Sequence, residues 1–297
     1  MDHPAPRPPV LSEPGFDLYG PAIPDCPVII SVPHAGRNYP ADLLAEARVR
    51  PHILRRLEDR WADLLAYPLI ARGYSVIVAR TARAMIDLNR HEREIDPAMI
   101  AGLPHDIALH SSAKLRGGLG LIPRRLPGAH ELWRGALSWP DIQRRIDQFH
   151  RPYHAALAQM MMAARDAHGH AILIDVHSMP TLPPPAAGQT APSVVFGDRF
   201  GRSASNRLVA LAADIAIGHG LLATQNHPYA GDHLIERHGR PDRGMHAIQV
   251  EIDRALYLDA ALDRPGPGLE RMRGFVTAMA DALAVENPGA AYAMAAE

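Results

Sequence analysis

Five short runs of apolar and β-branched residues recur along the chain, and segments with helical spacing of apolar residues lie between them. The run VIISV, residues 28–32, is apolar on both faces, which is typical of a central strand that is covered on two sides. Alternation of such strands with helices predicts an α/β fold with three layers, in which helices cover both faces of a mostly parallel, mixed sheet. The runs cover residues 28–32, 74–79, 170–176, 192–198 and 245–253.

The length of 297 residues is enough for a single large α/β domain, which we place at residues 27–287. Residues 1–26 are rich in proline and lack apolar periodicity, so we expect an extended N-terminal arm there. Residues 288–297 form an Ala-rich tail. Residues 91–139 are irregular and rich in glycine and proline, and they predict a long loop insertion, which in a compact domain usually carries function.

The balance of charge excludes some classes of partner. The chain has 31 Lys+Arg against 32 Asp+Glu, for a net charge of -1, and it lacks the basic stripe that nucleic acid or an anionic membrane surface requires. No run approaches the 18 apolar residues that cross a bilayer. With Cys26 as the single cysteine and no signal-peptide pattern, we expect a cytoplasmic protein that binds a small molecule. The sequence does not indicate an oligomeric state.

Two of the expected strands end in histidine, at His34 after VIISVP and at His177 after AILIDV. Ligands of open α/β sheets bind beyond the carboxyl ends of the strands. Neutral imidazoles, together with a carboxylate, are the ligands of a catalytic zinc site. Asp175, two residues before His177, favours this interpretation because a metal-bound imidazole usually donates its other N–H to an acceptor. Each histidine taken alone is more often a structural residue, so the spacing leaves both interpretations open.

The stretch DLNR, residues 87–90, follows the second expected strand. Asn89 and Arg90 offer an amide and a planar guanidinium, which together can hold a carboxylate in a fixed orientation. The alternative is that Asp87 caps a helix and that the arginine is solvated. From this segment alone the alternative is the better supported interpretation.

Glu251 lies within the last apolar run, in the sequence AIQVEID. A carboxylate between apolar strand residues is unfavourable to bury unless it has a partner or a catalytic role, and burial raises its pKa. One interpretation is a general base. The other is an ion pair with Arg254 or another arginine, and the segment does not decide between them.

These segments occur together and in one order, and through them the chain resembles the N-formylglutamate amidohydrolase family from about residue 28 to residue 258. That family is similar to the zinc carboxypeptidases and aspartoacylases, which implies their α/β fold with a single zinc ion. The segments that carry the resemblance are VPHAGRNYPADLL, LEDRWADLL, RAMIDLNR, GLGLIPRR, RPYHAAL, LIDVHSMP, VFGDRFG, NHPYAGD and GMHAIQVEIDRALYLD.

The resemblance implies a role for each matching residue. In the zinc enzymes the order is a metal-binding histidine, a metal-binding acid, an arginine near the metal, an Asn-Arg pair that binds the substrate carboxylate, a second metal-binding histidine and a catalytic glutamate. Glu58 and Asp63 are alternatives for the acidic ligand. On this chain the order becomes His34, Asp59, Arg83, Asn89 with Arg90, His177 and Glu251.

Further residues bear on the substrate. Arg240 or Arg243, before the last strand, is a candidate for binding a side-chain carboxylate, and a solvated arginine is the alternative for each. Asp232 stands where the family pattern has a glycine, and Asp253 where it has an asparagine. A new charge at Asp232 concerns the identity of the substrate more than the metal chemistry.

The function implied by the resemblance is hydrolysis of the N-formyl, or a related N-acyl, bond of an acidic amino acid such as N-formylglutamate. One Zn²⁺ per chain would take part, although iron, cobalt or manganese can also occupy a site of two histidines and one carboxylate. Histidine degradation is the usual setting of the family. The alternatives are a zinc peptidase or amidase that acts on another amide, and a non-catalytic relative that binds a metal or an amino acid.

Overall fold

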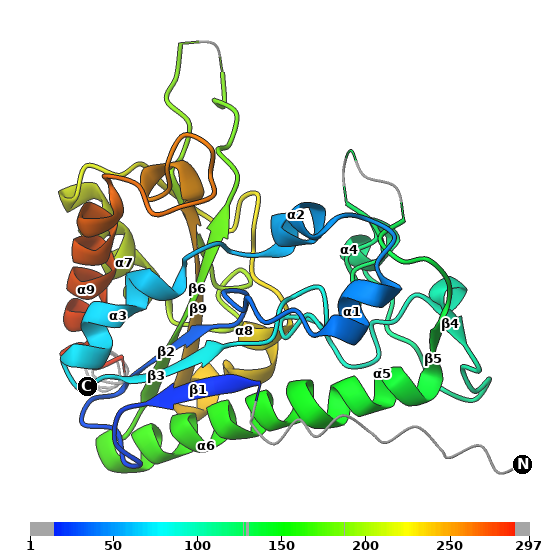
Figure 1. Ribbon diagram of the computed structural model, residues 1–297. Helices are drawn as coiled ribbons and strands as arrows, with labels where there is room; N and C mark the ends of the chain where they lie inside the picture. Colours follow the sequence, from blue (N-terminus) through cyan, green and yellow to red (C-terminus); the bar gives the residue numbers. More distant parts are fainter. Residues whose placement is uncertain (1–14, 127, 129–130, 187, 289–297) are drawn as a thin grey trace, which may run out of the picture.

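The computed structural model of the chain describes residues 15–126, 128, 131–186 and 188–288. At its centre lies a seven-stranded sheet in the order β1-β3-β2-β6-β9-β7-β8 (Figure 1). The four central strands β3, β2, β6 and β9 are parallel, whereas β1 is antiparallel to β3 and β7 is antiparallel to β9. The predicted α/β fold with a mostly parallel, mixed sheet is confirmed. The strands are β1 (Phe16–Tyr19), β2 (Val28–Val32), β3 (Ser75–Ala79), β6 (Ala171–Met179), β7 (Val194–Gly197), β8 (Ala223–Gln225) and β9 (Met245–Asp253).

Both faces of the sheet are buried, because neighbouring residues along a strand point to opposite sides. Ile174 and Ile248 belong to one hydrophobic cluster, whereas their neighbours Leu173 and Ala247 belong to another. α3, α7 and α9 cover the first face, and α6 and α8 cover the second (Figure 1). The predicted three layers are therefore confirmed. These helices are α3 (Asp63–Ala71), α6 (Arg151–His168), α7 (Asn206–Gly218), α8 (His233–His238) and α9 (Leu269–Ala284).

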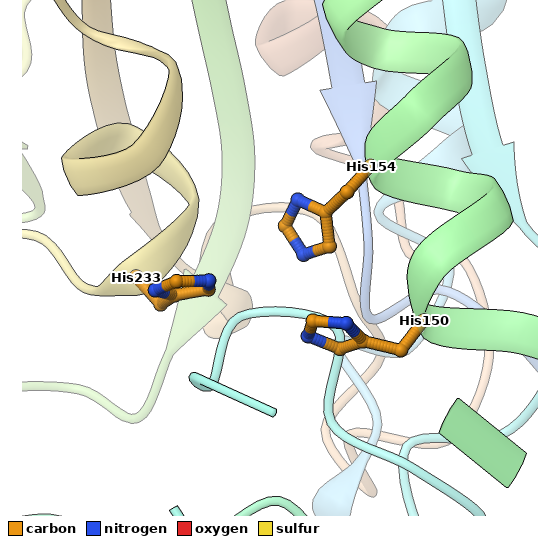
Figure 2. Close-up of side chains that lie close together, drawn as sticks. All are labelled: His150, His154 and His233. Carbon is orange, nitrogen blue, oxygen red and sulfur yellow. The ribbon is translucent and has the colours of Figure 1, made fainter. Parts of the chain in front are cut away.

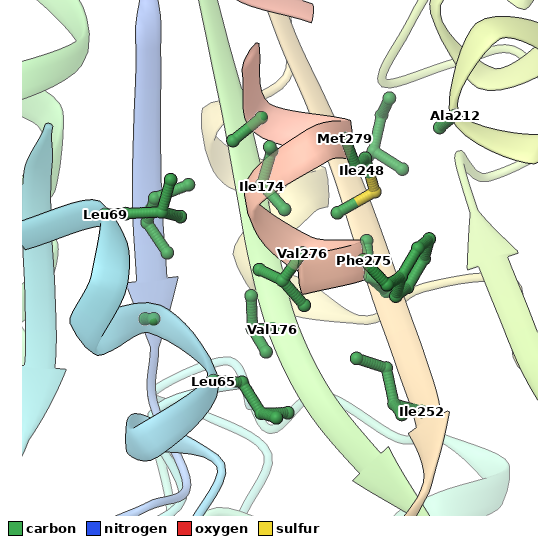
Figure 3. Packing of buried hydrophobic residues seen from close by; sticks show 14 of the residues in the cluster. Leu65, Leu69, Ile174, Val176, Ala212, Ile248, Ile252, Phe275, Val276 and Met279 are labelled. Atoms are coloured by element: carbon green, nitrogen blue, oxygen red, sulfur yellow. The ribbon is translucent and has the colours of Figure 1, made fainter. Parts of the chain in front are cut away.

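α9 covers the first face because its apolar residues recur at helical spacing and form one stripe. Met272, Phe275, Val276, Met279 and Leu283 are all buried. Figure 3 shows the side chains of α9 packed against those of β6 and β9. Among the described residues, every helix is too short or too polar to span a bilayer.

The N-terminal segment differs from the expected arm. β1 lies within residues 1–26, where it pairs with β3 and places Phe16 opposite Ala79. The domain therefore begins before the predicted boundary. The physical reason is that a four-residue edge strand needs pairing on one side only, and backbone groups supply it without an apolar run in the sequence. Residues 1–14, and residues 289–297 of the expected tail, lie outside the described residues.

Apolar residues of the insertion at residues 91–139 belong to the hydrophobic cluster of the second face. Leu121 and Trp133 belong to the same hydrophobic cluster as Leu157 of α6. A helical segment follows it and contains one π-helical turn. The remaining elements are α1 (Ala41–Glu46), α2 (Pro51–Leu54), η1 (Arg55–Leu57), η2 (Pro97–Met99), β4 (Ile100–Ala101), α4 (Ala113–Arg116), β5 (Leu137–Ser138), α5 (Trp139–Arg145), the π-helical turn η3 (Ile146–His150), η4 (Pro241–Arg243) and η5 (Arg254–Leu256).

Replacing Phe275 with alanine should lower the free energy of unfolding by about 3–5 kcal/mol, because it opens a cavity between α9 and the sheet. Chemical denaturation followed by circular dichroism measures this change. Val285, directly after the same helix, is 87% exposed, so Val285→Ala is the matched control and should change the free energy by less than about 0.5 kcal/mol. Equal effects of the two substitutions would contradict the packing of α9 described above.

Candidate active site

One face of the sheet changes from apolar to polar toward the carboxyl ends of the parallel strands. Along β6, Leu173 lies in the hydrophobic core, and Asp175 and His177 follow on the same side at alternate positions. β9 shows the same change, with Gln249 beside Asp175 and Glu251 beside His177. Because the two strands are parallel and in register, their polar residues meet at the end of the sheet where ligands bind in such folds.

His34 follows β2 at this end of the sheet and is almost completely buried. Its Nε2 lies 2.7 Å from Oδ1 of Asp87. Burial alone would raise the pKa of Asp87, but Arg83 and His34 outweigh it and hold that pKa well below its usual range. An ionised Asp87 accepts a hydrogen bond, so Nε2 of His34 carries the proton. The lone pair of Nδ1 then faces the centre of the site.

His177 is part of β6, and a chain of buried hydrogen bonds fixes its ring. Nε2 lies 2.8 Å from Oδ2 of Asp175, and the hydroxyl of Ser31 donates to Asp175 over 2.9 Å. The hydroxyl of Tyr153 lies 3.0 Å from that of Ser31. Burial alone would lower the pKa of His177, but the carboxylates of Asp175 and Asp59 raise it well above its usual value. Like the first histidine, this ring presents Nδ1 to the centre.

Asp59 lies between the two rings. Its Oδ2 is 3.0 Å from Nδ1 of His177 and 3.4 Å from Nδ1 of His34. A backbone hydrogen bond from the Asp59 N–H to the His34 carbonyl, 3.0 Å long, holds the two segments together. Burial would raise the pKa of Asp59, but the neighbouring imidazoles of His177 and His34 hold it well below its usual value. The three residues therefore form one compact group.

The two alternative acids have other partners. Oε1 of Glu58 accepts a hydrogen bond of 2.5 Å from the hydroxyl of Tyr39. Asp63 binds Arg37 through both carboxylate oxygens, at 2.8 and 2.7 Å. The spacing of Asp59 and Asp63 suggests a shared helix face, but α3 begins at Asp63 and Asp59 lies in the irregular segment before it. Of the three acids, Asp59 alone faces the two histidines.

This group has the properties of a metal-binding site. One possible ligand atom each of His34, Asp59 and His177 lies within 4.8 Å of the others. Two imidazole nitrogens and a carboxylate oxygen are typical ligands of catalytic zinc. Nδ1 of His34 is buried and has no hydrogen-bond partner among the described residues, which is unfavourable unless a cation binds it. Asp87 and Asp175 stand behind the rings, as carboxylates usually do behind metal-binding histidines.

Glu251 lies beside His177 on the neighbouring strand. Its Oε1 accepts a hydrogen bond of 2.9 Å from the amide of Gln249. Within the described part of the chain it forms no ion pair, and Arg254 lies 3.8 Å from Asp59 instead. Burial raises the pKa of Glu251 above its ordinary value. A carboxylate with a raised pKa next to the metal-binding group has the position and the proton affinity of a general base.

Asn89 and Arg83 also reach this end of the sheet. The Asn89 amide donates to Oε1 of Gln249 over 3.1 Å, and its oxygen accepts from the Leu234 N–H over 2.7 Å. Nε of Arg83 donates to Oδ2 of Asp87 over 2.8 Å. Both side chains line the cavity in front of the metal-binding group. The segment DLNR therefore contributes an amide to the cavity and a carboxylate behind it.

Arg90 is buried and already has carboxylate partners. Nη1 lies 2.8 Å from Oδ1 of Asp232, and Nε lies 3.8 Å from Oδ2 of Asp87. Burial alone would lower the pKa of Arg90, but the two carboxylates raise it. Among the described residues, Asp232 lines the cavity in front of the metal-binding group, whereas Arg90 does not. The sequence predicts that Arg90 binds a carboxylate of the substrate. In the structure its guanidinium pairs instead with the carboxylate of Asp232.

Arg240 and Arg243 lie away from the cavity. Nη1 of Arg240 donates to the carbonyls of Glu236 and Gly239, each over 2.6 Å, at the end of α8. Both arginines precede β9, so they lie at the amino end of that strand, whereas the cavity lies at its carboxyl end. The role of Arg240 in binding a substrate carboxylate stays a prediction, and its position at the amino end of β9 does not support that role.

The cavity has a volume of about 200 Å³, below the range of about 300–1,000 Å³ that is common for drug-sized ligands. Lys114, Leu119 and Leu126 of the insertion line it together with residues of the sheet. Lys114 is the single lysine of the chain. Its Nζ lies 5.4 Å from the centre of the Tyr229 ring, and among the described residues it forms no ion pair.

Comparisons with known proteins place the chain in a family. Residues 26–258, more than half of the chain, match the family model for N-formylglutamate amidohydrolase. The chain belongs to the N-formylglutamate amidohydrolase family. The N-formylglutamate deformylase of Pseudomonas aeruginosa is 28% identical over 243 residues, which cover 78% of this chain and 82% of the relative. The N-formylglutamate deformylase of Pseudomonas putida is 28% identical over 246 residues, with the same coverage.

Solved structures agree with this assignment. The crystal structure of the N-formylglutamate amidohydrolase from Ralstonia eutropha JMP134 matches with a TM-score of 0.82 at 32% identity, covering 90% of this chain and 95% of that one. A gene product of Agrobacterium tumefaciens shares the fold, with a TM-score of 0.63 at 16% identity over 91% of this chain and 92% of that one. Membership of the N-formylglutamate amidohydrolase family confirms the predicted resemblance. It also confirms the prediction of an enzyme that hydrolyses an amide bond.

Sequence reasoning misses two residues of this N-formylglutamate amidohydrolase site. The segment DLNR favours a helix-capping role for Asp87. In the structure the carboxylate of Asp87 instead accepts a hydrogen bond from Nε2 of His34 and so orients that ring. No local pattern distinguishes the two roles. Lys114 lies in an irregular insertion. Its one sequence signal is that it is the single lysine, because the other Lys+Arg residues of the chain are all arginines.

Replacing Asp232 with asparagine should lower the free energy of unfolding by about 1–3 kcal/mol, because buried Arg90 loses its nearest carboxylate. Urea denaturation measures the change. Asp242 is exposed, and Asp242→Asn should have an effect below about 0.5 kcal/mol. If Asp232→Asn is as stable as the original protein, the ion pair does not stabilise this loop.

Proposed function

We propose that the protein is a metal-dependent hydrolase that removes the formyl group from an N-formylated acidic amino acid, with N-formylglutamate as the simplest substrate. The observation that carries this proposal is the position of His34, Asp59 and His177 beside Glu251, in one cavity of a chain from this family. The name of the Pseudomonas relatives, N-formylglutamate deformylase, supports the choice of substrate.

His34, Asp59 and His177 would hold one divalent ion per chain. Two nitrogens and one carboxylate oxygen suit zinc, and they also suit iron, cobalt or manganese. Such an ion supplies Lewis acidity, which lowers the pKa of water to about 7 and polarises the carbonyl of the scissile bond. Asp87 and Asp175 keep both rings in the tautomer that leaves Nδ1 free for the ion.

Glu251 is the residue that moves the proton. Its raised pKa favours acceptance of a proton from the attacking water, and the same carboxyl then delivers that proton to the leaving nitrogen. The hydrogen bond from Gln249 holds the carboxylate toward the cavity. Arg83 lines the cavity and is held by Asp87, so its guanidinium meets the negative charge that develops on the carbonyl oxygen.

Lys114 is the cation that we assign to a carboxylate of the substrate. Asp232 occupies Arg90, which would reach a substrate carboxylate only by exchanging this partner. Lys114 lines the cavity without an ion pair in the described part of the chain, and its flexible stem lets the ammonium follow a small ligand. Asn89, which also lines the cavity, offers a further polar contact.

A single amino acid suits the cavity better than a peptide does. The insertion contributes Lys114, Leu119 and Leu126 to the lining, so it forms part of the cavity wall, whereas a peptidase needs a groove that is open at both ends. The zinc peptidase alternative is therefore less well supported. Histidine degradation and a cytoplasmic location stay predictions, and the sequence and fold do not indicate an oligomeric state.

Replacing Glu251 with glutamine should lower kcat for N-formylglutamate by at least about 10²-fold, because an amide cannot accept the proton. Metal analysis of the same sample should show unchanged zinc, whereas His34→Ala should lose zinc together with activity. These two measurements separate proton transfer from metal binding. Substantial turnover by Glu251→Gln would remove its role as the base.

Replacing Lys114 with methionine should raise KM for N-formylglutamate at least about 10-fold, which corresponds to about 1.4 kcal/mol of binding. KM for an N-formyl amino acid with a neutral side chain should change less, and Lys114→Arg should restore part of the difference. Because the chain has one lysine, an amine-reactive label can modify only this side chain and the N-terminus. N-formylglutamate should protect Lys114 from the label in mass spectrometry, and equal labelling with and without it would argue against contact.

A further inference from the structure

A second group of histidines lies outside the candidate active site. One ring nitrogen each of His150, His154 and His233 lies within 4.8 Å of the others. His150 ends the π-helical turn η3, His154 follows one turn later in α6, and His233 begins α8. Figure 2 shows the three rings around one common space, with His233 reaching toward the other two from a different helix.

Several nitrogens of this group are buried without a partner. Both ring nitrogens of His233 and Nδ1 of His150 have no hydrogen-bond partner within the described part of the chain. Such atoms are rare in folded proteins unless water or an ion binds them. Nε2 of His150 donates to the carbonyl of Arg90 over 2.8 Å. The proton is therefore on Nε2, and the lone pair of Nδ1 points into the group.

His154 is the most deeply held of the three rings. Nε2 donates to the carbonyl of Leu88 over 2.9 Å, and Nδ1 lies 2.9 Å from Nε2 of His238. To bind a metal ion, one ring nitrogen of His154 must give up its present hydrogen bond. The contact that remains then fixes the ring from behind, which is the usual arrangement at a metal-binding histidine.

Burial acts in the same direction on every ring of this group. Burial lowers the pKa of His150 to about 4 and that of His233 to about 3. Burial also lowers the pKa of His154 well below its usual value and that of His238 to about 3. Near neutral pH the group therefore presents uncharged imidazoles to one space.

A path from solvent leads to this group. His233 lines a cavity of about 440 Å³, together with His91, Asp232 and Glu236. The ring centre of His91 lies 5.1 Å from that of His233. The cavity provides access for an ion, and water or His91 can complete a coordination shell of four.

We propose that His150, His154 and His233 form a second metal site, which binds Zn²⁺ or a similar divalent transition ion and joins α6 to α8. Three imidazoles without a carboxylate suit such ions, whereas Mg²⁺ and Ca²⁺ require oxygen ligands. The three ring nitrogens lie within 4.8 Å of one another, and bonds of about 2.0–2.1 Å to one ion would draw them closer together. A π-helical turn at the first ligand is also typical of functional sites.

The position of the site gives it a structural role. His150 binds the carbonyl of Arg90, and His233 directly follows Asp232, which pairs with the guanidinium of Arg90. An ion at the histidines therefore holds both halves of this ion pair in place. It braces the segment that carries Asn89 into the candidate active site.

Metal titration of the full chain tests the proposal. Chelator-stripped protein is dialysed against Zn²⁺, and in parallel against Co²⁺, and bound metal is measured by mass spectrometry. The original protein should bind two equivalents, His233→Gln one, His34→Ala one, and the double variant less than half an equivalent. His233 is the chosen position because its ring has no hydrogen-bond partner among the described residues, so glutamine removes no such bond.

His52→Gln is the matched control, because His52 is an exposed histidine of α2 and should leave both equivalents in place. Circular dichroism verifies the fold of each variant, and His150→Gln gives a second, independent variant of the site. If the original protein binds only one equivalent and His233→Gln binds none, the result supports the second site and argues against the first. The proposal is overturned if His34→Ala binds no metal, or if His233→Gln and His150→Gln both bind as much as the original protein.

Discussion

The burial of several carboxylates at one end of the sheet is the constraint on which the rest of the site depends. Asp59, Asp87, Asp175 and Glu251 are all buried there. A buried carboxylate is strongly unfavourable unless cations or hydrogen-bond donors surround it. Imidazoles, guanidiniums and amides from the segments that follow β2 and β3, and from β6 and β9, provide these partners. Each partner reaches its acid only when the parallel strands are in register, so the same register that builds the core also assembles the chemistry.

Arg90 connects the two groups of histidines. Its side chain pairs with Asp232 at the edge of the candidate active site, while its carbonyl accepts a hydrogen bond from His150 of the second group. The residues DLNR thus have the catalytic cavity on one side and the histidines of α6 and α8 on the other. Any change that moves α8 relative to α6 is transmitted to Asn89, because the Leu234 N–H binds its side chain.

Recognition of an anionic substrate depends on which cationic side chains of the site lack a carboxylate partner within the protein. Asp232 neutralises the most deeply buried arginine of the site, so the charge of Arg90 serves the fold as much as the ligand. Lys114 comes from the insertion and stands without an ion pair in the described part of the chain. An ammonium on a flexible stem adapts to a ligand more readily than a guanidinium held by two acids. The insertion therefore contributes part of the cavity wall together with Lys114.

The sequence by itself determined the layers of the fold, because strands that are apolar at consecutive positions require helices on both faces. The order of its motifs, through the resemblance to the family, also implied that His34, His177 and Glu251 belong to one site, and parallel strands bring their carboxyl ends to the same edge. Only the tertiary structure decided which of three acids faces the histidines, that Arg90 is occupied from within, and that Arg240 lies at the opposite end of β9. The physical reason is that a charged side chain takes the partner nearest in space, and sequence spacing does not reveal that distance.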